Sequence, residues 1–394
     1  MRSELPAGWT EETLGDLADN HDKHRVPLSS RERQKRQGPY PYWGANGVLD
    51  HVDDYLFEGP HVLIAEDGTV ERSDGRAVVH WVDGKFWVNN HAHILTARSG
   101  INQRWLYYAL RNVRITSYLT GSVQLKLTQT NLRQIPLAKP SEADQDRIAS
   151  TLGSLDEKIE SNRRLAETLE GIAAAVFKSR FIDFVGHSDL VESEIGPVPR
   201  GWQVMPVSEA VAINPAVSAL KKGATGPHVG MADVPAWGVR PSRFGEREYT
   251  GGARFEPGDT LMARITGCIE YGKGAFVDFL DRPGAGSTEF LVLRAQPPLT
   301  EEMVFLLSRT ARVRDHAIAN MSGSSGRQRV PTSAFDHVAI AIPPDAQVIE
   351  KEADLFRAVF RQTRALWRMN RTLTKIRDLL LPRLVSGQDL LEAG

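Results

Sequence analysis

The chain contains one cysteine, Cys268, in 394 residues. One thiol cannot form an internal disulfide, and it supplies too few ligands for a cysteine-rich zinc site. No apolar run approaches the roughly 20 residues that a helix needs to cross a bilayer. The first residues, MRSELPAGWTEETL, also lack the apolar centre of a signal peptide. We therefore expect a cytoplasmic protein without a membrane segment.

Motifs for several kinds of catalysis are also missing. The sequence has no GxxxxGK loop followed by Ser or Thr, and no methyl-donor glycine motif with an Asn-Pro-Pro-aromatic tetrad. Glu66 and Asp67 resemble a nuclease carboxylate pair, but a turn before Gly68 explains them better. His91 and His93 place two imidazoles on one face of a strand without an obvious further set of metal ligands. We expect no catalytic centre and no metal site.

The chain has almost no net charge, because 48 Lys and Arg residues are balanced by 49 Asp and Glu residues. Proteins that bind DNA usually carry a basic footprint for the phosphates. A neutral total still permits local basic patches. If this chain binds DNA, partner subunits or a wrapped assembly should supply much of the affinity.

The sequence does contain an internal repeat. The matches keep apolar and aromatic positions, and the polar positions between them have diverged. They pair residues 6–9 with 199–202, 63–65 with 261–263, 89–95 with 287–293, 105–108 with 303–306, 121–140 with 324–343, and 162–165 with 370–373. Two copies that keep a scaffold and change their polar loops indicate two different targets. An old duplication without divided roles is the alternative.

Two long segments carry a heptad pattern of apolar residues. The first runs from Glu142 to Arg180 without a proline, and the second from about Asp345 to Leu381, where Pro382 should end the helix. Each helix would span roughly 55 Å at about 1.5 Å per residue. A stripe of this length needs a partner, and the simplest partner is the other helix.

Two asparagines and a charge pattern support this pairing. Asn162 and Asn370 both lie in the apolar seams, where a polar residue fixes the register of the helices. Acidic residues gather on the first helix between 156 and 170, and basic residues on the second between 357 and 375. The alternative is that the basic stripe contacts DNA or another subunit.

The fold class that follows is α+β: two repeated strand-rich domains, each followed by a long helix, with the helices packed as a coiled-coil spacer. Short apolar segments separated by Gly, Asp and Pro indicate the strands. One amphipathic helix is expected in each domain, near Arg104–Arg111 and Glu301–Arg312. The expected parts are a first domain over 1–140, a helix over 141–182, a linker over 183–196, a second domain over 197–344, and a helix with a tail over 345–394.

Two equivalent tail loops are the preferred DNA contacts. Residues 121–126 and 322–329 combine glycines, which let the backbone approach a phosphate, with positive charge. The candidates there are Gln124 and Lys126 in the first domain, and Arg327 and Arg329 in the second.

Three other places offer DNA contacts with weaker arguments. The segment 31–37 holds Arg33, Lys35 and Arg36 beside glutamines that can pair with adenine, although an ordinary solvated loop explains it equally well. Arg240 and Arg243 form a basic cluster that could be ordinary surface. Arg264 follows a strand and could enter a groove, or it could form a structural salt bridge.

In the order of these segments, the sequence resembles the specificity subunits of type I restriction-modification enzymes. The resemblance covers essentially the whole chain. It rests on Pro-x-Gly-Trp at the start of each unit, on Trp-Val-Asn-Asn-His-Ala-His at 87–93, on Gly-Ser-Thr-Glu-Phe at 286–290, on Ile-Pro-Leu at 135–137, and on Leu-Leu-Pro-Arg-Leu-Val-Ser-Gly at 380–387.

The resemblance implies that each domain is a target-recognition domain for one half of a split, asymmetric site in double-stranded DNA, and that the paired helices set the spacing. Two modification (methyltransferase) subunits would dock on the helices and methylate adenine with S-adenosylmethionine. Restriction (translocase and nuclease) subunits would use ATP and Mg²⁺. The chain itself would bind no cofactor and catalyse no reaction. Base contacts differ between family members with their targets, so none is carried over.

Three other functions stay open at this point. The chain could be a fused nuclease with an unrecognised active site, or a repeat scaffold that binds only proteins. It could also be a specificity module of another defence system with the same fold.

Overall fold

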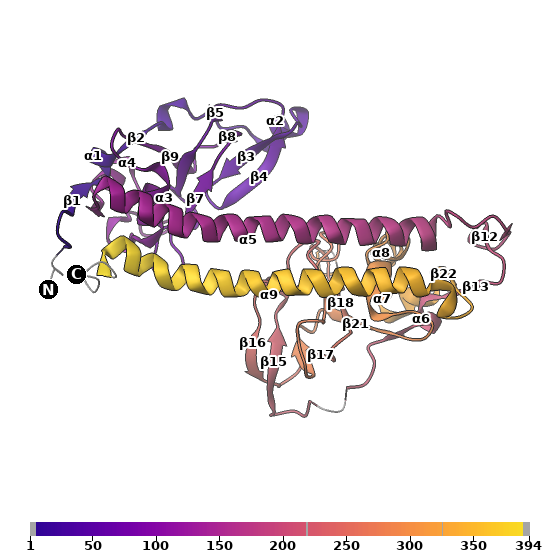
Figure 1. The fold of residues 1–394 in the computed structure, drawn as a ribbon. Coiled ribbons are helices and arrows are strands. Elements are labelled where there is room, and N and C mark those ends of the chain that lie inside the picture. Colours follow the sequence, from indigo (N-terminus) through magenta and orange to yellow (C-terminus); the bar gives the residue numbers. More distant parts are fainter. Residues whose placement is uncertain (1–4, 218–219, 325, 389–394) are drawn as a thin grey trace. The chain divides into compact units, whose positions relative to one another are not determined.

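The computed structural model describes residues 5–217, 220–324 and 326–388. The chain divides into two compact units, each a mixture of strands and helices as predicted (Figure 1). Unit 1 comprises Met1–Ser161 with Asn370–Gly394, and unit 2 comprises Asn162–Met369. Each unit therefore contains a part of both long helices, which the predicted domain boundaries treat as separate segments.

Unit 1 is built on two four-stranded sheets. The first has the order β2-β9-β6-β7 and the second the order β4-β3-β8-β5, in which β3 and β8 are parallel. A two-stranded sheet joins β1 to β10. The strands are β1 (Thr10–Thr13), β2 (Ala18–Asn20), β3 (Tyr40–Gly44), β4 (Gly47–Val52), β5 (Phe57–Glu58), β6 (His61–Ala65), β7 (Val79–Val82), β8 (Lys85–Val88), β9 (Ala92–Ala97) and β10 (Pro136–Lys139).

Unit 2 repeats this topology. Its sheets have the orders β14-β21-β18-β19 and β16-β15-β20-β17, with β15 and β20 parallel, and β13 pairs with β22. A further hairpin joins β11 (Leu190–Val191), in the segment predicted as a linker, to β12 (Val198–Pro199), just after that segment. The other strands are β13 (Gln203–Pro206), β14 (Val211–Ile213), β15 (Thr225–Val229), β16 (Gly245–Glu248), β17 (Ala253–Phe255), β18 (Thr260–Ala263), β19 (Gly274–Phe276), β20 (Gly284–Gly286), β21 (Phe290–Ala295) and β22 (Ala339–Ile342).

The central strands explain why these sheets form. Every residue of β6 and of β18 is buried, as expected for short continuous apolar strands covered on both faces. Trp9 and Trp202, from the two Pro-x-Gly-Trp segments, are also buried and belong to the cores of their own units. The repeated apolar positions therefore preserve two separate cores with one topology.

Each unit has a helix near the one predicted for it, together with short helices that were not predicted. Unit 1 has α1 (Leu14–Leu17), α2 (Ser30–Lys35), α4 (Gln129–Arg133) and, near the predicted position, α3 (Gln103–Asn112). Unit 2 has α6 (Val207–Ala210), but the single predicted helix is two helices, α7 (Glu301–Ser308) and α8 (Ala311–Ala319). The chain breaks because the Thr310 hydroxyl accepts a hydrogen bond from the amide of Val313 and starts a new helix.

The two long helices are α5 (Glu142–Phe177), continued by a π-helical turn over Lys178–Ile182, and α9 (Glu350–Ser386). In unit 1 the Asn370 side chain donates a hydrogen bond to the carbonyl of Ile159, 3.0 Å away, and Arg377 pairs with Asp156 at 2.7 Å. Within unit 1 the helices are thus in contact and run antiparallel. Asn162, the other seam asparagine, is buried in unit 2.

The helices do more than contact each other, because both also enter the globular cores. In unit 2 the aromatic rings of Phe177 and Phe356 lie 6.0 Å apart in the main core. The acidic residues of α5 do not all pair with α9 as predicted: Glu157 pairs with Arg104 of α3, and Glu170 with Arg240.

Pro382 does not end α9, which continues to Ser386. Proline lacks the amide that a helix interior needs, but Leu381 and Val385 are buried in the core of unit 1 and hold this last turn in place. The helix ends before Gly387, which has a φ of 75° and suits a glycine after a helix. No helix in the described part of the chain is long and apolar enough to cross a membrane.

Candidate nucleic-acid interface

In each unit, two antiparallel strands of the first sheet meet at one edge. Ala65, the last residue of β6, lies opposite Ala92, the first residue of β9. In unit 2, Ala263 at the end of β18 lies opposite Phe290 at the start of β21. We call this position the strand-end edge of each unit. The two loops predicted to contact DNA, residues 121–126 and 322–329, lie at these edges.

In unit 1 the loop 120–127 is fastened at its base and exposed at its tip. The backbones of Thr120 and Lys126 exchange two hydrogen bonds of 2.8 and 2.9 Å. The amide of Leu127, a buried residue, donates to the carbonyl of Glu66 at 2.8 Å. Val123 at the tip is fully exposed. The base of the loop is therefore part of the sheet edge, and its tip is free to contact a ligand.

The loop 322–330 of unit 2 is fastened in the same way. Ser322 and Arg329 exchange two backbone hydrogen bonds of 3.0 and 2.8 Å. The amide of Val330, which is buried, donates to the carbonyl of Arg264 at 2.8 Å. Ser325 lies outside the described residues. The two loops thus start from equivalent positions on the same scaffold.

An ion pair at the edge of unit 1 fixes the charged end of the loop. The Lys126 ammonium lies 2.8 Å from one oxygen of Glu66, and the Arg25 guanidinium lies 2.6 Å from the other. Burial acts to raise the pKa of Glu66, but the hydrogen bonds from Lys126 and Arg25 outweigh it, so that this pKa is lowered. Glu66 is therefore ionised and held between two cations.

Unit 2 has the corresponding ion pair on different residues. The Arg329 guanidinium binds both carboxylate oxygens of Glu289, with its shortest contact at 2.7 Å. Hydrogen bonding by Arg329 lowers the pKa of Glu289. Glu289 occupies the place of His91 in the repeat, and Arg264 the place of Glu66. The acidic residue follows the strand β6 in unit 1 but precedes the strand β21 in unit 2, and the loop cation has an acidic partner in both units.

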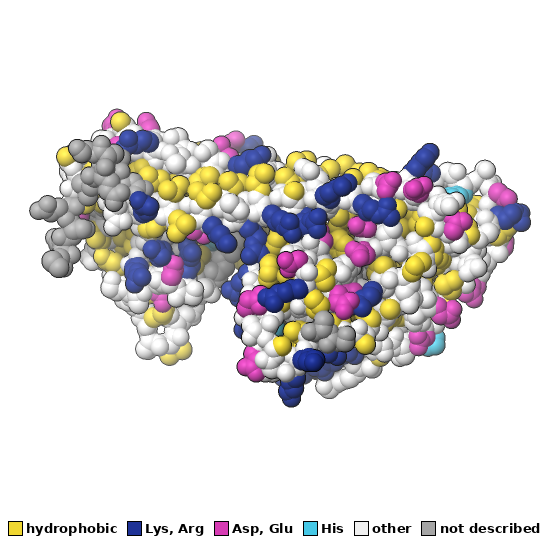
Figure 2. Space-filling view, turned by 60° about the horizontal axis from the view of Figure 1, so that its bottom comes forward, with side chains coloured by type: hydrophobic (Ala, Val, Ile, Leu, Met, Phe, Trp, Pro, Cys, Tyr) yellow, Lys and Arg dark blue, Asp and Glu magenta, His cyan; other side chains and the backbone are white. Residues whose placement is uncertain are grey.

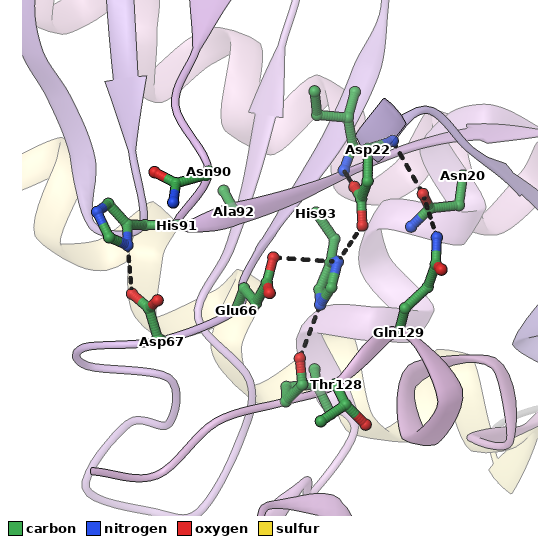
Figure 3. Close-up of polar contacts among 12 residues, drawn as sticks. Asn20, Asp22, Glu66, Asp67, Asn90, His91, Ala92, His93, Thr128 and Gln129 are labelled. Atoms are coloured by element: carbon green, nitrogen blue, oxygen red, sulfur yellow. Dashed lines mark hydrogen bonds and ion pairs between the residues drawn. The ribbon is translucent and has the colours of Figure 1, made fainter. Parts of the chain in front are cut away.

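A buried histidine adds a second anchor in unit 1 (Figure 3). The His93 ring is 1% exposed; its Nδ1 lies 2.5 Å from Asp22 and its Nε2 lies 2.8 Å from the carbonyl of Leu127. Both partners accept hydrogen bonds, so the ring donates from both nitrogens. Burial opposes the ionisation of Asp22, but the hydrogen bond with His93 contributes to a lowered Asp22 pKa. Leu291 occupies this place in unit 2.

Asp22, Glu66 and His93 also offer ligand atoms within 4.8 Å of one another, as a metal site would. Arg25 and Lys126 already bind the same carboxylates. A metal ion would have to displace both cations, so the arrangement favours a closed network of ion pairs.

His91 points away from this network (Figure 3). Its Nδ1 lies 2.7 Å from Asp67, and the ring is about half exposed. This contact orients the imidazole at the exposed side of the edge, where its other nitrogen can meet a ligand. Neither Glu66 nor Asp67 forms the nuclease pair considered from the sequence, because each is paired to a basic side chain.

The segment 31–37 is a helix for the most part, α2, rather than a loop. Ser29 and Glu32 form a capping box that starts it. Arg33 is half-buried and pairs with Asp50 at 3.1 Å, which attaches α2 to β4. These contacts give Arg33 a structural role beside the predicted DNA contact.

The other two cations of this segment, Arg36 and Lys35, differ in how closely they are held by neighbouring side chains. Arg36 pairs with Asp53 at 2.9 Å and lies over the ring of Trp87. Lys35, at the end of α2, is exposed.

Arg240 corrects the sequence analysis. The residue is 6% exposed, and its guanidinium donates to Asp278 at 2.7 Å, to Thr363 at 3.0 Å and to the carbonyl of Phe360 at 2.9 Å. It joins the segment that follows β19 to α9. A buried and fully bonded arginine is not a surface contact for DNA, and no local pattern around Arg240 indicates its burial.

The remaining candidates lie on the surface. Gln124 and Arg327 are exposed on the two loops, and Arg243 is exposed and paired with Asp233. Arg264 follows β18 as expected and is half-buried, but the predicted alternative of a salt bridge is absent among the described residues. The DNA contacts of these residues stay predictions.

Sequence reasoning missed the partners that fix the loops. Arg25, Glu66, Glu289 and His93 were not predicted as anchors of these loops. The sequence does contain a sign of these ion pairs. Each edge has one acidic residue that the other repeat copy lacks at the same position, and each loop ends in a cation. The separation of these residues in the chain hid the pairing.

The chain matches known proteins of one kind. Residues 6–171 match the family described as "Type I restriction modification DNA specificity domain". A putative type I restriction enzyme specificity subunit of Haemophilus influenzae is 37% identical over 36% of this chain and 36% of its own length. The EcoprrI specificity subunit of Escherichia coli is 29% identical over 36% of this chain and 35% of its length. The aligned segments span about a third of these relatives.

A longer match and a solved structure extend the likeness. The HindI specificity subunit of Haemophilus influenzae is 22% identical over 67% of this chain and 71% of its own length. The crystal structure of a type I restriction-modification S subunit from M. genitalium has a TM-score of 0.56 and 14% identity, covering 98% of both chains. At this identity the structural likeness concerns the fold.

Proposed function

Since this chain belongs to the family of type I restriction-modification DNA specificity proteins, we propose that it is the DNA-recognition subunit of such a system. One unit reads one half of a split DNA site, and the other unit reads the second half. The observation that carries this proposal is the pair of strand-end edges. They hold equivalent exposed loops, each ending in a cation, on one topology with different polar neighbours.

The features kept in both edges and the features that differ have separate roles. Two half-sites of DNA share a phosphate backbone, so the conserved loop geometry and its cation suit phosphate contacts. Half-sites differ in their bases, which side chains read in the grooves. The residues that differ between the edges, such as His91 and Glu289 or Gln124 and Arg327, are therefore the better candidates for base contacts.

The proposed partners dock on the long helices. Figure 2 shows hydrophobic side chains along the surface of these helices, between Lys and Arg side chains. The exposed ones are Leu165, Ile172, Leu355, Met369, Ile376 and Leu379. Exposed apolar patches of this kind mark interaction sites. We assign them to two modification subunits, which bring S-adenosylmethionine; restriction subunits add ATP- and Mg²⁺-dependent cleavage, and this chain supplies no catalytic group.

The helices would also set the distance between the half-sites. Inserting one heptad into both α5 and α9 should then lengthen the unspecified spacer of the recognised site. An unchanged spacer with retained methylation would exclude this role.

Sequencing of methylated adenines tests the proposal directly. A host carrying the chain with its neighbouring modification genes should show a methylated motif with two unrelated halves. Replacing residues 122–125 by Gly-Ser-Gly-Ser should change or abolish recognition of one half of the DNA site and leave the other half unchanged. A continuous motif, or no methylation together with DNA binding, would assign the chain to another system.

A further inference from the structure

Unit 2 has an open hollow of about 400 Å³ beside its strand-end edge. Phe290 and Val292, both buried, belong to β21 and form its apolar part. The rest of the lining comes from the end of β14, from the connection between β16 and β17, and from the residues that follow β18. This size suits one nucleotide unit, since pockets for small ligands start at about 300 Å³.

The polar lining of the hollow consists of hydrogen-bond donors. Arg254 and Arg264 bring two guanidinium groups, and Thr288 brings a hydroxyl. Asn214 accepts from the amide of Val292 with its carbonyl oxygen, which leaves its NH₂ group as a donor. Among the residues that the structure describes, no Asp or Glu lines the hollow. A group with several acceptor oxygens and negative charge is the complement of such a surface.

Arg264 is the residue that most requires a ligand. Its Nε is buried and has no hydrogen-bond partner, and its guanidinium forms no ion pair with any residue the structure describes. Glu289 is the nearby acid, but its carboxylate is bound by Arg329. Arg254 gives one hydrogen bond, to the carbonyl of Leu220 at 3.3 Å, and keeps other donors. A buried donor without a hydrogen-bond partner is unfavourable, and a ligand oxygen would satisfy it.

We propose that this hollow binds a phosphodiester of DNA, a contact that rests on the proposed function. Arg264 and Arg254 bind the phosphate oxygens, and the apolar part receives the sugar. Unit 1 lacks this site, because Glu66 occupies the place of Arg264 in the repeat and Leu56 the place of Arg254. Unit 2 therefore holds the DNA backbone at one point more than unit 1 does.

Salt-dependent binding of the full chain to a random 40-base-pair duplex tests the proposal. Each phosphate contact contributes about 0.9 to the slope of log affinity against log salt. Arg264→Gln should lower this slope by about 0.9 and weaken binding about tenfold at low salt, while Arg264→Lys keeps most of both. The matched control is Arg200→Gln, which removes an exposed arginine paired with Asp189 far along the chain from the edge. Thermal unfolding of each variant verifies that the chain is folded.

A second arm separates DNA from a small phosphate. NMR of the arginine side chains follows the Nε–H signal of Arg264 during titration with inorganic phosphate and with the duplex. A shift with the duplex and the lowered slope support the proposal. An unchanged slope in Arg264→Gln, with DNA still bound, overturns it and leaves the proposed function intact. A shift with phosphate and none with the duplex overturns the DNA contact, whereas the methylation pattern separately tests the proposed function. No shift with either probe overturns the site.

Discussion

At both strand-end edges an acidic residue pairs with the cation of an equivalent loop, but the acidic residue comes from a different strand in each unit. In unit 1 the acid is Glu66, after β6, and in unit 2 it is Glu289, before β21. The position that corresponds to Glu289 is His91 in unit 1, and the position that corresponds to Glu66 is Arg264 in unit 2. Because the ion pair survived while its residues moved, the position of the loop cation matters more than the identity of its partner.

The units also differ in how the globular part meets the long helices. In unit 1, Asp156 of α5 accepts from Tyr108 of α3 and from Arg377 of α9, both at 2.7 Å. In unit 2 a buried arginine, Arg240, takes the centre and Asp278 is its main partner. One scaffold therefore carries a half-buried carboxylate in one copy and a buried guanidinium in the other. Five substitutions test this comparison.

The largest effect is expected from Arg240→Ala. It leaves Asp278 buried without its cation, and breaking a buried pair in this way costs about 3–5 kcal/mol. Hydrogen exchange of the full chain should show faster opening of β18 in unit 2 and no change in β6 of unit 1. Arg200→Ala, which removes only an exposed pair, is the control. Equal protection of β18 in both variants would contradict the structural role of Arg240.

His93→Leu gives unit 1 the residue that unit 2 has at the same place. Leu291 lies in an apolar core, whereas leucine at 93 would leave Asp22 and the carbonyl of Leu127 without their donor. We expect a loss of about 3 kcal/mol in unit 1. The amide of Leu127 should exchange faster, and that of Val330 should not. Leu291→Met is the neutral control, and an unchanged Leu127 amide would show that the histidine does not fasten the loop.

One carboxyl group in each unit, Glu170 in unit 2 and Glu66 in unit 1, should contribute to stability with opposite dependence on pH. Burial raises the pKa of Glu170 in unit 2 to about 7, although Arg240 opposes the shift. The folded unit then keeps a proton that the unfolded chain releases, so its stability falls as pH rises from about 4.5 to 7. In unit 1 the pKa of Glu66 is lowered, so that contribution is present above about 4.5 and is lost on acidification.

Glu170→Gln should remove the loss in unit 2 and stabilise it by about 2 kcal/mol at pH 8. Urea unfolding at pH 5.5 and pH 8, followed by methyl signals of each unit, measures both responses. Glu167→Gln, on the same helix and exposed, is the control. The same response to pH in wild type and Glu170→Gln would refute the buried carboxyl as its cause.

The smallest effect on stability is expected at the loop cations. Lys126 is about half exposed, so Lys126→Gln should cost no more than about 0.5 kcal/mol. Arg329→Gln also removes an exposed side chain and should leave unit 2 folded. If both cations contact phosphates, each variant lowers the salt slope of DNA binding by about 0.9. Unequal slopes would show that the two loops no longer share one role.

The repeat and the apolar patterns made the fold predictable, since they preserve β6, β18 and both long helices. The burial of Arg240 could not be predicted, because it depends on Asp278 and Thr363, which lie far apart in the sequence. The end of α9 was misplaced for a similar reason. Local propensity at Pro382 favours a stop, and packing of Leu381 and Val385 in unit 1 overrides it.

The loop positions were recognised from the sequence because glycines and cations recur at matching places. Their anchors were not, because Glu66 and Glu289 occupy different positions in the repeat. When the two copies are aligned residue by residue, Glu66 and Glu289 do not fall on each other, so the alignment does not reveal that both form the same kind of ion pair. Only the paired strand ends place both acids at one edge.

Because unit 1 is assembled from residues 1–161 and 370–388, its core stays incomplete during most of the chain's synthesis. A ribosome adds about 5–20 residues per second, so the early sheets wait roughly 10–40 s for Leu381 and Val385. During that interval unit 2 can finish folding first. A nascent chain that stops before residue 370 would leave the core of unit 1 without Leu381 and Val385, and we expect such a fragment to be cut by proteases faster than the full chain.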